Sequence, residues 1–485
     1  MRIIHSGFRI VIAISFFVEA SSTALDREPS GVRVERQRVG GMGFMDGLVS
    51  LYDWARKGLT RAFGGSGSKK SDDPSGGSDP PASSKLGLFD SSLFNQVVVI
   101  PDVHGDADFF IESLWIGFTK VESRETVGAL DFKTFRDAIL ATAETIEFPS
   151  GLPAVQPDAK LSKMGQSVAI VQLGDIMDRG LDPFLSYKIL ASIEPVIGWK
   201  LIQLFGNHEL MIYDPSCHED ERSSCGGETT YFNTNDNSMV NGHGQLIATD
   251  IANEAQNERI VSVGQLFGPG GSLWKYLNSH NLLMARIGGP YTSSKYTVNP
   301  KSPDTLFVHA GYLTRYLVNE IPGFDRLATS DLIGGINLAM RNQFSKHPEK
   351  TAGFAKDKTS PVNIRLIPNA EGSALEELCN ELAETLVALQ VSRIVVGHTP
   401  PKDGNDENPI RTFCHKRFIV TDVMMSRGFT EHHGGQPFGL VMNLESSSLD
   451  SIFGYFEKPH DISLERHYPV AADKSYKHEE HNILE

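Results

Sequence analysis

The chain has 485 residues, of which 40% are hydrophobic and 22% charged, and its formal net charge is −15. This length and composition are ordinary for a folded protein of one large domain or two smaller ones. The negative charge, with no basic stripe able to neutralise a phosphate backbone, argues against a nucleic-acid partner. A locally positive metal site could still attract a small phosphate group.

Residues 1–24 have the layout of a secretory signal peptide. Arg2 and Arg9 flank a start that runs into the apolar stretch 10–18, and small residues ending at Ala24 follow, so we expect cleavage after Ala24. The alternative is an uncleaved membrane anchor, but this apolar stretch is short for a span. No later stretch is long enough for a transmembrane helix. We therefore expect a protein of the secretory pathway, either secreted or in an endomembrane lumen.

Residues 25–85 predict a leader before the folded domain. Apolar side chains recur at helical spacing over 44–63, with charged side chains on the opposite face. This amphipathic helix could dock peripherally on a membrane surface or a partner, or it could pack on the main domain or belong to a propeptide. Residues 64–85 are rich in Gly, Ser, Pro and Asp and carry too few apolar side chains to fold, which predicts a linker.

Residues 86–457 alternate short apolar runs with helical patterns, which indicates an α/β domain. Strands are predicted at 97–100, 168–173, 201–205, 305–308, 393–396, 418–423, 438–445 and 451–457. Helices are predicted at 107–118, 131–146, 181–193, 271–279 and 373–390. The polar segment 214–265 predicts an insertion, either a lid or a surface elaboration, and residues 458–485 predict a polar C-terminal tail.

The four cysteines would face an oxidising compartment in the secretory pathway. Cys217 and Cys225 lie close together in a polar segment, so a small disulfide between them is plausible. Cys379 falls in a helical pattern and Cys414 near a strand, and both are expected to be buried thiols. The four lack the spacing of a zinc-thiolate site.

Five polar clusters follow apolar runs along the chain. They are Asp102-Val-His104-Gly-Asp106, Asp175-Ile-Met-Asp178-Arg179, Asn207-His208-Glu209, His309-Ala-Gly and Gly-His398. Side chains at the ends of neighbouring strands converge on one rim of a sheet, so we expect these clusters to meet. Charged groups repeated at the ends of buried strands are hard to explain by packing alone.

Six side chains in these clusters are suited to bind metal ions: Asp102, His104, Asp175, Asn207, His309 and His398. Their oxygen and imidazole donors suit Mn, Fe or Zn. Asp102 and His104 are two residues apart and can reach one ion, while the Asp175 carboxylate can bridge two. Two divalent ions can share a bridging water, lower its pKa and hold phosphate oxygens for in-line attack. The pattern therefore predicts a two-metal phosphoesterase.

Three further side chains are expected to act on the phosphoester without binding metal. His208 follows Asn207 directly and can protonate the leaving-group oxygen, with Asp178 orienting its ring. Arg179 is suited to clamp the phosphate through two hydrogen bonds.

These clusters resemble those of the calcineurin-like metallophosphoesterases of the phosphoprotein phosphatase superfamily, whose pattern runs GDxHG, GDxxDRG, GNHE or GNHD, HGG or HAG, and GH. Within the superfamily the chain is most similar to the Shewanella-like protein phosphatases, also over 268–289 and 421–428. The resemblance spans about residues 95–457. It implies a central β-sandwich flanked by helices, with a dimetal site at the strand ends.

The resemblance also implies roles for single residues. Asp102, His104 and Asp175 would bind the first metal. The ligands of the second metal would be Asp175, Asn207, His309 and His398. Where the family has its first glycine, this chain has Pro101, which stiffens the backbone but removes no ligand. The family's second phosphate-binding arginine is matched by no motif; Arg341 is the candidate and Arg365 the alternative.

Together these features predict a metal-dependent phosphatase with two divalent ions, acting on phosphoserine, phosphothreonine or phosphotyrosine in proteins. Attack would come from a metal-bridging hydroxide. An alternative is a small-molecule phosphoesterase, for example a dinucleoside polyphosphate hydrolase, that uses the same site. A binding module without catalysis would have lost a ligand or His208, and none is lost.

Overall fold

The computed structural model describes residues 86–157, 159–177, 183–211, 270–289, 304–313, 332–401, 410–426, 436–444 and 452–456. The chain divides into two compact units, Met1–Ser78 and Asp79–Glu485, and all described residues belong to the second. Five predicted segments lie outside the described residues. They are the signal peptide, the helix at 44–63, the linker, the insertion at 214–265 and the tail. Among the helices of the described residues, none is long and apolar enough to cross a membrane.

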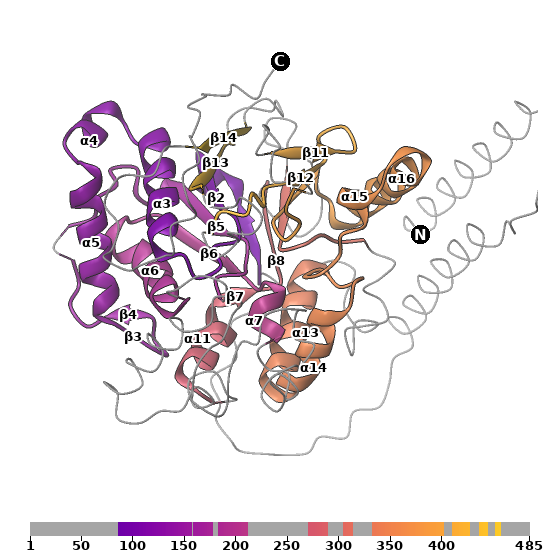
Figure 1. The fold of residues 1–485 in the computed structure, drawn as a ribbon, viewed down its shortest axis with the longest axis horizontal. Helices are drawn as coiled ribbons and strands as arrows, with labels where there is room; N and C mark the ends of the chain where they lie inside the picture. Colours follow the sequence, from indigo (N-terminus) through magenta and orange to yellow (C-terminus); the bar gives the residue numbers. More distant parts are fainter. Residues whose placement is uncertain are drawn as a thin grey trace, which may run out of the picture. The chain divides into compact units, whose positions relative to one another are not determined.

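Two six-stranded sheets form the centre of the second unit (Figure 1). The first sheet has the order β1 (Leu88–Asp90), β8 (Met284–Gly288), β9 (Thr305–Val308), β10 (Arg393–Val396), β12 (Phe418–Val420) and β11 (Arg411–Phe413). The second has the order β14 (Ile452–Phe456), β13 (Phe438–Asn443), β2 (Gln96–Ile100), β5 (Val168–Gln172), β6 (Lys200–Leu204) and β7 (Asn281–Leu282). A separate hairpin pairs β3 (Ile146–Glu147) with β4 (Leu152–Pro153).

The sheets pack face to face because their strands are apolar on both sides. In β2, Val97 and Val99 join a core cluster that also contains Ile287 and Phe307 of the first sheet. Val98, one residue along, points to the opposite side and joins the core beneath the helices. Successive side chains of a strand point to opposite faces of the sheet. Because both faces of this sheet are buried, the run 97–100 in β2 is apolar throughout rather than alternating between apolar and polar residues.

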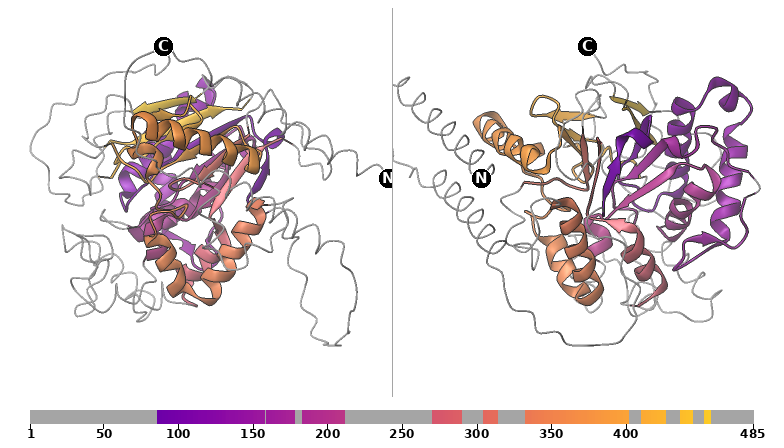
Figure 2. Two further views of the ribbon diagram at one scale, coloured as in Figure 1. Left: turned by 90° about the vertical axis from the view of Figure 1, so that its right-hand side faces the viewer. Right: turned by 180° about the vertical axis from the view of Figure 1, so that it is seen from behind.

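Helices cover the outer faces of this sandwich. Those on the side of the second sheet are α3 (Ala107–Val121), α4 (Arg124–Gly128), α5 (Phe132–Glu144) and α6 (Pro183–Val196) (Figures 1 and 2). The later helices are α7 (Asn207–Met211), α11 (Ser272–His280), α13 (Leu332–Lys346), α14 (Pro348–Lys356), α15 (Leu366–Asn369) and α16 (Gly372–Leu389). Two short 3-10 turns are η2 (Ser91–Leu93) and η3 (Gly165–Ser167). The predicted mixed α/β fold with a flanked β-sandwich is thus present, and each predicted helix and strand is confirmed.

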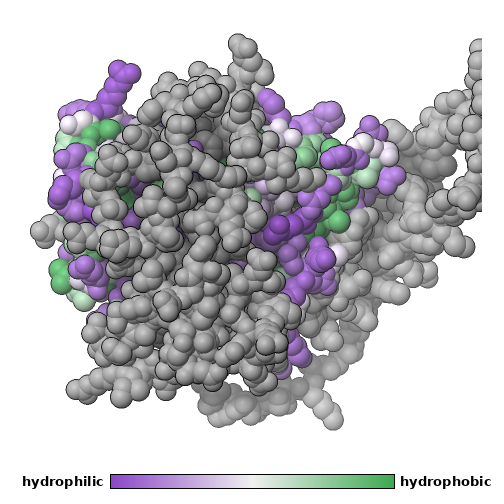
Figure 3. Space-filling model, viewed as in Figure 1, coloured by the Kyte–Doolittle hydropathy of each residue, from purple (hydrophilic) through white to green (hydrophobic). Residues whose placement is uncertain are grey.

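The described surface is largely polar. On the face shown in Figure 3 its visible residues are mostly hydrophilic, with smaller hydrophobic patches between them. The large apolar side chains that are exposed in the described chain are few, namely Leu93, Leu152, Val155, Leu338 and Val387. Single exposed apolar residues of this kind are normal for a folded protein.

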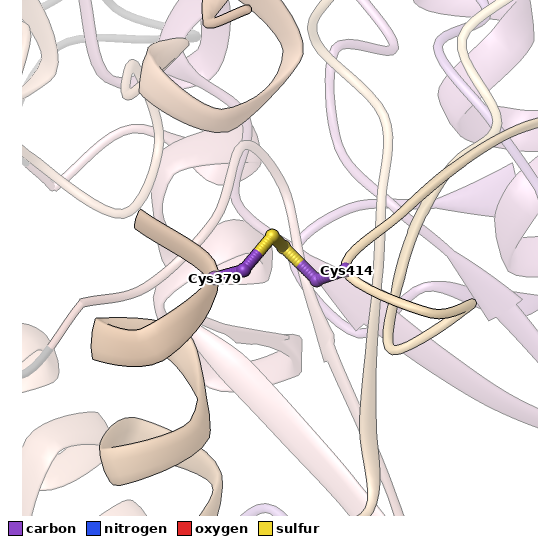
Figure 4. Close-up of a disulfide and its surroundings, with 2 residues drawn as sticks. All are labelled: Cys379 and Cys414. Atoms are coloured by element: carbon purple, nitrogen blue, oxygen red, sulfur yellow. A yellow bond between two sulfur atoms is a disulfide. The ribbon is translucent and has the colours of Figure 1, made fainter. Parts of the chain in front are cut away.

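The cysteine prediction is wrong for two residues. Cys379 and Cys414 are not separate thiols but form a disulfide that joins α16 to the turn between β11 and β12 (Figure 4). Their Cα atoms are 5.1 Å apart, although 35 residues separate them in sequence. The sequence could not show this proximity because it arises from packing of α16 beside the hairpin. Cys217 and Cys225 lie outside the described residues.

The topology brings the polar clusters together. Strands β2, β5 and β6 are parallel neighbours, so their carboxyl ends lie at one edge of the second sheet. Strands β9 and β10 are likewise parallel neighbours in the first sheet. Helix α3 begins shortly after the end of β2. The Asp106 side chain caps this helix by accepting a hydrogen bond from the Phe109 amide.

Candidate metal centre

Asp175, which follows β5, lies at the centre of the clustered side chains. Its Oδ2 atom is 3.2 Å from Nε2 of His309, 3.6 Å from Nε2 of His208 and 3.7 Å from Nε2 of His104. Its Oδ1 atom accepts a hydrogen bond from the His208 amide at 3.0 Å. Each of these side chains is less than one-tenth exposed. One carboxylate therefore faces imidazoles that come from three separate strand ends.

Asp102 and His398 form the other side of the cluster. The His398 amide donates to Oδ2 of Asp102 at 2.9 Å, which links residues 296 apart in sequence. Oδ1 of Asp102 is 3.8 Å from Nδ1 of His309 but has no hydrogen-bond partner among the described residues, although it is buried. A Cβ on Gly397 would lie 2.1 Å from this oxygen, so only glycine allows the close approach.

The histidine tautomers follow from their backbone partners. Nδ1 of His104 is 3.2 Å from the Met177 carbonyl, and Nδ1 of His309 is 2.8 Å from the Leu173 carbonyl. A carbonyl oxygen can only accept, so both Nδ1 atoms must carry the proton. Nε2 of each ring is then the atom directed to Asp175, which is the arrangement that metal-binding histidines show.

Burial and charge shift the pKa values within the cluster. Burial opposes ionisation of Asp175, but His208 and His309 outweigh it, and the pKa of Asp175 lies well below its ordinary value. For Asp102, burial and the charge of Asp422 raise the pKa well above its ordinary value. Burial likewise opposes protonation of His309, yet Asp175 and Asp102 together raise its pKa to about 9.

His398 is surrounded differently. Its Nε2 atom is 3.0 Å from Nε of Arg365, which donates to it, and 3.1 Å from Oδ1 of Asn363. Burial, followed by the positive charge of Arg365, holds the pKa of His398 well below its ordinary value. A neutral imidazole is the form that binds a cation.

These donors fit divalent cations. Within the described part of the chain, two groups of side chains have potential ligand atoms that all lie within 4.8 Å of one another. They are His104 with Asp175 and His208, and Asp175 with His309 and His398, so Asp175 belongs to both. Nε2 of His309 also lies 3.0 Å from Oδ1 of Asn207, so this nitrogen faces two oxygen acceptors. A cation in place of the Nε2 proton would interact favourably with this nitrogen and with both oxygens, Oδ1 of Asn207 and Oδ2 of Asp175. The buried Oδ1 of Asp102 is a further oxygen donor of the kind that a divalent cation accepts.

Three positions of the cluster have an unusual backbone. His104, Asp175 and His398 have φ angles of 47°, 52° and 64°, in the left-handed region that side chains with a Cβ disfavour. Each such residue costs on the order of 1–3 kcal/mol, and this cost is tolerated where the surroundings determine the conformation. Here it directs three side chains into one place.

The predicted residues therefore divide into three sets. The structure brings together all the predicted ligands and His208, at Asp102, His104, Asp175, Asn207, His208, His309 and His398. It does not bring Arg341 to them: its guanidinium donates to the Ser279 carbonyl at the end of α11. Arg365, the alternative, is the arginine that touches His398. Asp178 and Arg179 lie outside the described residues.

Sequence reasoning missed the parts played by Glu209, Asn363 and Asp422. Glu209 belongs to the third cluster, and an acid directly beside two candidate site residues is a usable sequence signal. Asn363 reaches the site from a segment that carries no recognisable pattern. Asp422 lies within 421–428, a stretch similar to the Shewanella-like protein phosphatases, but that similarity assigns no role to a single residue. Their placement depends on contacts that only the folded chain makes.

No protein-family model matches the chain, and no curated protein matches it. Among solved structures it is similar to a cold-active protein-tyrosine phosphatase of a psychrophilic Shewanella species, with 16% identity over 76% of this chain and 82% of that one and a TM-score of 0.39. It is also similar to a protein serine/threonine phosphatase of Saccharomyces cerevisiae, with 10% identity over 78% and 84% of the two chains and a TM-score of 0.35. At these values the likenesses carry no argument about function, which depends on the site itself.

Proposed function

We propose that this chain is a metal-dependent phosphatase that hydrolyses phosphomonoesters, with phosphoserine, phosphothreonine or phosphotyrosine of proteins as its substrates. The observation that carries the proposal is the Asp175 carboxylate, which belongs to both of the His/Asp groups able to hold a cation. A carboxylate shared between two imidazole-containing groups is an arrangement that suits a pair of divalent ions. The sequence motifs support a place among the Shewanella-like protein phosphatases.

The ligands of two ions would be Asp102, His104, Asp175, Asn207, His309 and His398. When bound, divalent ions such as Mn, Fe or Zn would supply Lewis acidity that activates water and offsets charge on the phosphoryl oxygens. The buried positions of the ligands exclude bulk water and strengthen every charge interaction in the site.

The remaining residues would handle the phosphoester. Arg365, whose Nε lies against His398, is placed to hold a phosphate oxygen beside the ligands. Arg179 would be the second clamp. His208 would protonate the leaving-group oxygen, with Asp178 orienting its ring. The signal-peptide pattern supports action in the secretory pathway, and the amphipathic helix at 44–63 would provide peripheral docking.

The test measures hydrolysis by the chelator-treated full chain after addition of Mn²⁺, Fe²⁺ or Zn²⁺. The substrates are phosphoserine, phosphothreonine and phosphotyrosine peptides and a dinucleoside polyphosphate. Asp175→Asn should lower kcat at least about 100-fold because it weakens the shared ligand. His208→Ala should lower kcat roughly 100-fold or more on phosphoserine, and less on an aryl phosphate whose leaving group needs no proton.

The matched control is Asp137→Asn, which changes an exposed carboxylate paired with Lys133 on α5 and should leave kcat unchanged. Wild-type rates in both site variants would contradict the dimetal mechanism. If the chain hydrolysed the dinucleoside polyphosphate but none of the phosphopeptides, it would be a small-molecule phosphoesterase rather than a protein phosphatase.

A further inference from the structure

We propose that Tyr187 and Glu209 are positioning residues that hold the Asp175 turn in the conformation that binds metal. This inference rests on the proposed function, since it concerns the same ligand. Neither side chain is among the cation-binding groups, so both would act through the backbone that carries Asp175.

The Glu209 carboxylate collects the amides of this turn. Its Oε2 accepts from the Asp175 amide at 2.8 Å, and its Oε1 accepts from the amides of Ile176 and Met177 at 2.7 and 3.2 Å. Oε2 also accepts from the Gly206 amide at 2.8 Å. Glu209 is fully buried, so these hydrogen bonds replace the water that its charge would otherwise require.

The turn needs such support because its backbone is unfavourable by itself. Asp175 has a φ of 52°, and three successive amides, from 175 to 177, point to one carboxylate. The opposite side of the turn is also held, because the Asp175 carbonyl accepts from the amides of Val103 and His104 at 3.0 and 2.8 Å. A Cβ on Gly206 would lie 2.0 Å from Oδ1 of Asp175 and 2.7 Å from Oε2 of Glu209, so the two loops are in close contact.

Tyr187 links this arrangement to the helical layer. It is fully buried in α6, and its hydroxyl donates to Oε1 of Glu209 at 3.0 Å. The hydroxyl is the one side-chain donor among the five hydrogen bonds that Glu209 is seen to accept in the described chain. It is the third donor to Oε1, beside the amides of Ile176 and Met177, and so helps to hold the carboxylate against the turn.

Glu209→Gln keeps the shape of the side chain but replaces one oxygen with an NH2 group. That group would face amides that also donate, so the turn would lose acceptors and gain a repulsive contact. Tyr187→Phe is milder because it removes one hydroxyl and leaves the ring in place.

The experiment measures Co²⁺ binding to the full chain by calorimetry and by the visible absorption of the bound ion, with thermal unfolding recorded in chelator. Glu209→Gln should weaken binding about 10–100-fold and change the absorption spectrum, as loss of an outer partner of a ligand does. Tyr187→Phe should weaken binding about 2–10-fold, the effect of one hydrogen bond.

Tyr276→Phe is the matched control. Tyr276 is also a buried phenol, but its hydroxyl accepts from Gln203 and its ring packs on Phe148, away from the cluster. This variant should lower thermal stability while Co²⁺ affinity and spectrum stay at wild-type values.

The outcomes separate the two proposals. If Tyr187→Phe lowers the unfolding temperature but binds Co²⁺ with wild-type affinity and spectrum, the residue is merely structural and the inference is overturned. This variant decides the matter even if Glu209→Gln does not fold. A wild-type chain that binds no divalent ion contradicts the proposed function instead, and the positioning role is overturned with it.

Discussion

Arg341 and Arg365 differ in what their guanidinium groups contact. Arg365 donates to Nε2 of His398, whereas Arg341 donates to the backbone carbonyl of Ser279. Arg365→Ala should therefore lower kcat/KM roughly 10–100-fold, because a charged hydrogen bond to phosphate is worth about 1.5–3 kcal/mol. Arg341→Ala is the matched control and should change kcat/KM less than about threefold. Equal losses in steady-state assays of the two variants would show that the assignment to Arg365 is mistaken.

For single residues, a motif indicates the chemical role of a side chain but not its orientation. A motif predicts Asp175, His309 and His398 as ligands because few other roles suit those side chains at strand ends. It says nothing of the left-handed backbone at Asp175 and His398, which determines where the side chains point. That conformation is imposed by neighbours such as Glu209, 34 residues from Asp175.

Among the elements, α16 and the β11–β12 hairpin are joined by the Cys379–Cys414 disulfide. The hairpin also contacts the loop after β10, because Arg411 donates to the Thr399 carbonyl next to His398. Cys379→Ser with Cys414→Ser should lower the free energy of unfolding by about 2–4 kcal/mol, as expected for a cross-link that closes a loop of this size. Chemical denaturation in oxidising buffer measures the difference.

Reductant provides the control for this prediction. Reductant should lower the denaturation midpoint of the wild type to that of the double variant. If reductant also lowers the midpoint of the double variant, the additional change indicates a disulfide between Cys217 and Cys225. Equal midpoints for wild type and double variant in oxidising buffer would show that the cross-link contributes no stability.

For the whole molecule, the buried cluster links folding to pH. Burial opposes protonation of His309, but Asp175 and Asp102 raise its pKa to about 9, above the value near 6.5 expected in the unfolded chain. A raised pKa stabilises the fold below pH 6.5, and this stabilisation is lost as pH rises to about 9. Chelator-treated protein should therefore become less stable over this window. Bound Mn²⁺ should reverse the trend, because the cation replaces the proton and binds more tightly at high pH.

Urea denaturation at pH 6.5, 7.5 and 9, with chelator or with Mn²⁺, measures this dependence. His309→Gln is the control and should show a flatter profile in chelator, since it carries no titrating ring. A wild-type stability in chelator that stays level or increases from pH 6.5 to 9 would contradict the assignment of a proton to His309.

The sequence by itself was enough to predict eight of the strands and five of the helices in the described chain, since apolar runs and helical periods depend on neighbouring residues. It also predicted the polar clusters that the fold brings together, because polar groups at buried strand ends are distinctive. Tertiary structure decided what depends on residues far apart in the chain. It paired Cys379 with Cys414, brought Arg365 rather than Arg341 to His398, and placed Glu209 under the Asp175 turn. These contacts arise from how the sheets and helices pack, and no local pattern encodes such packing.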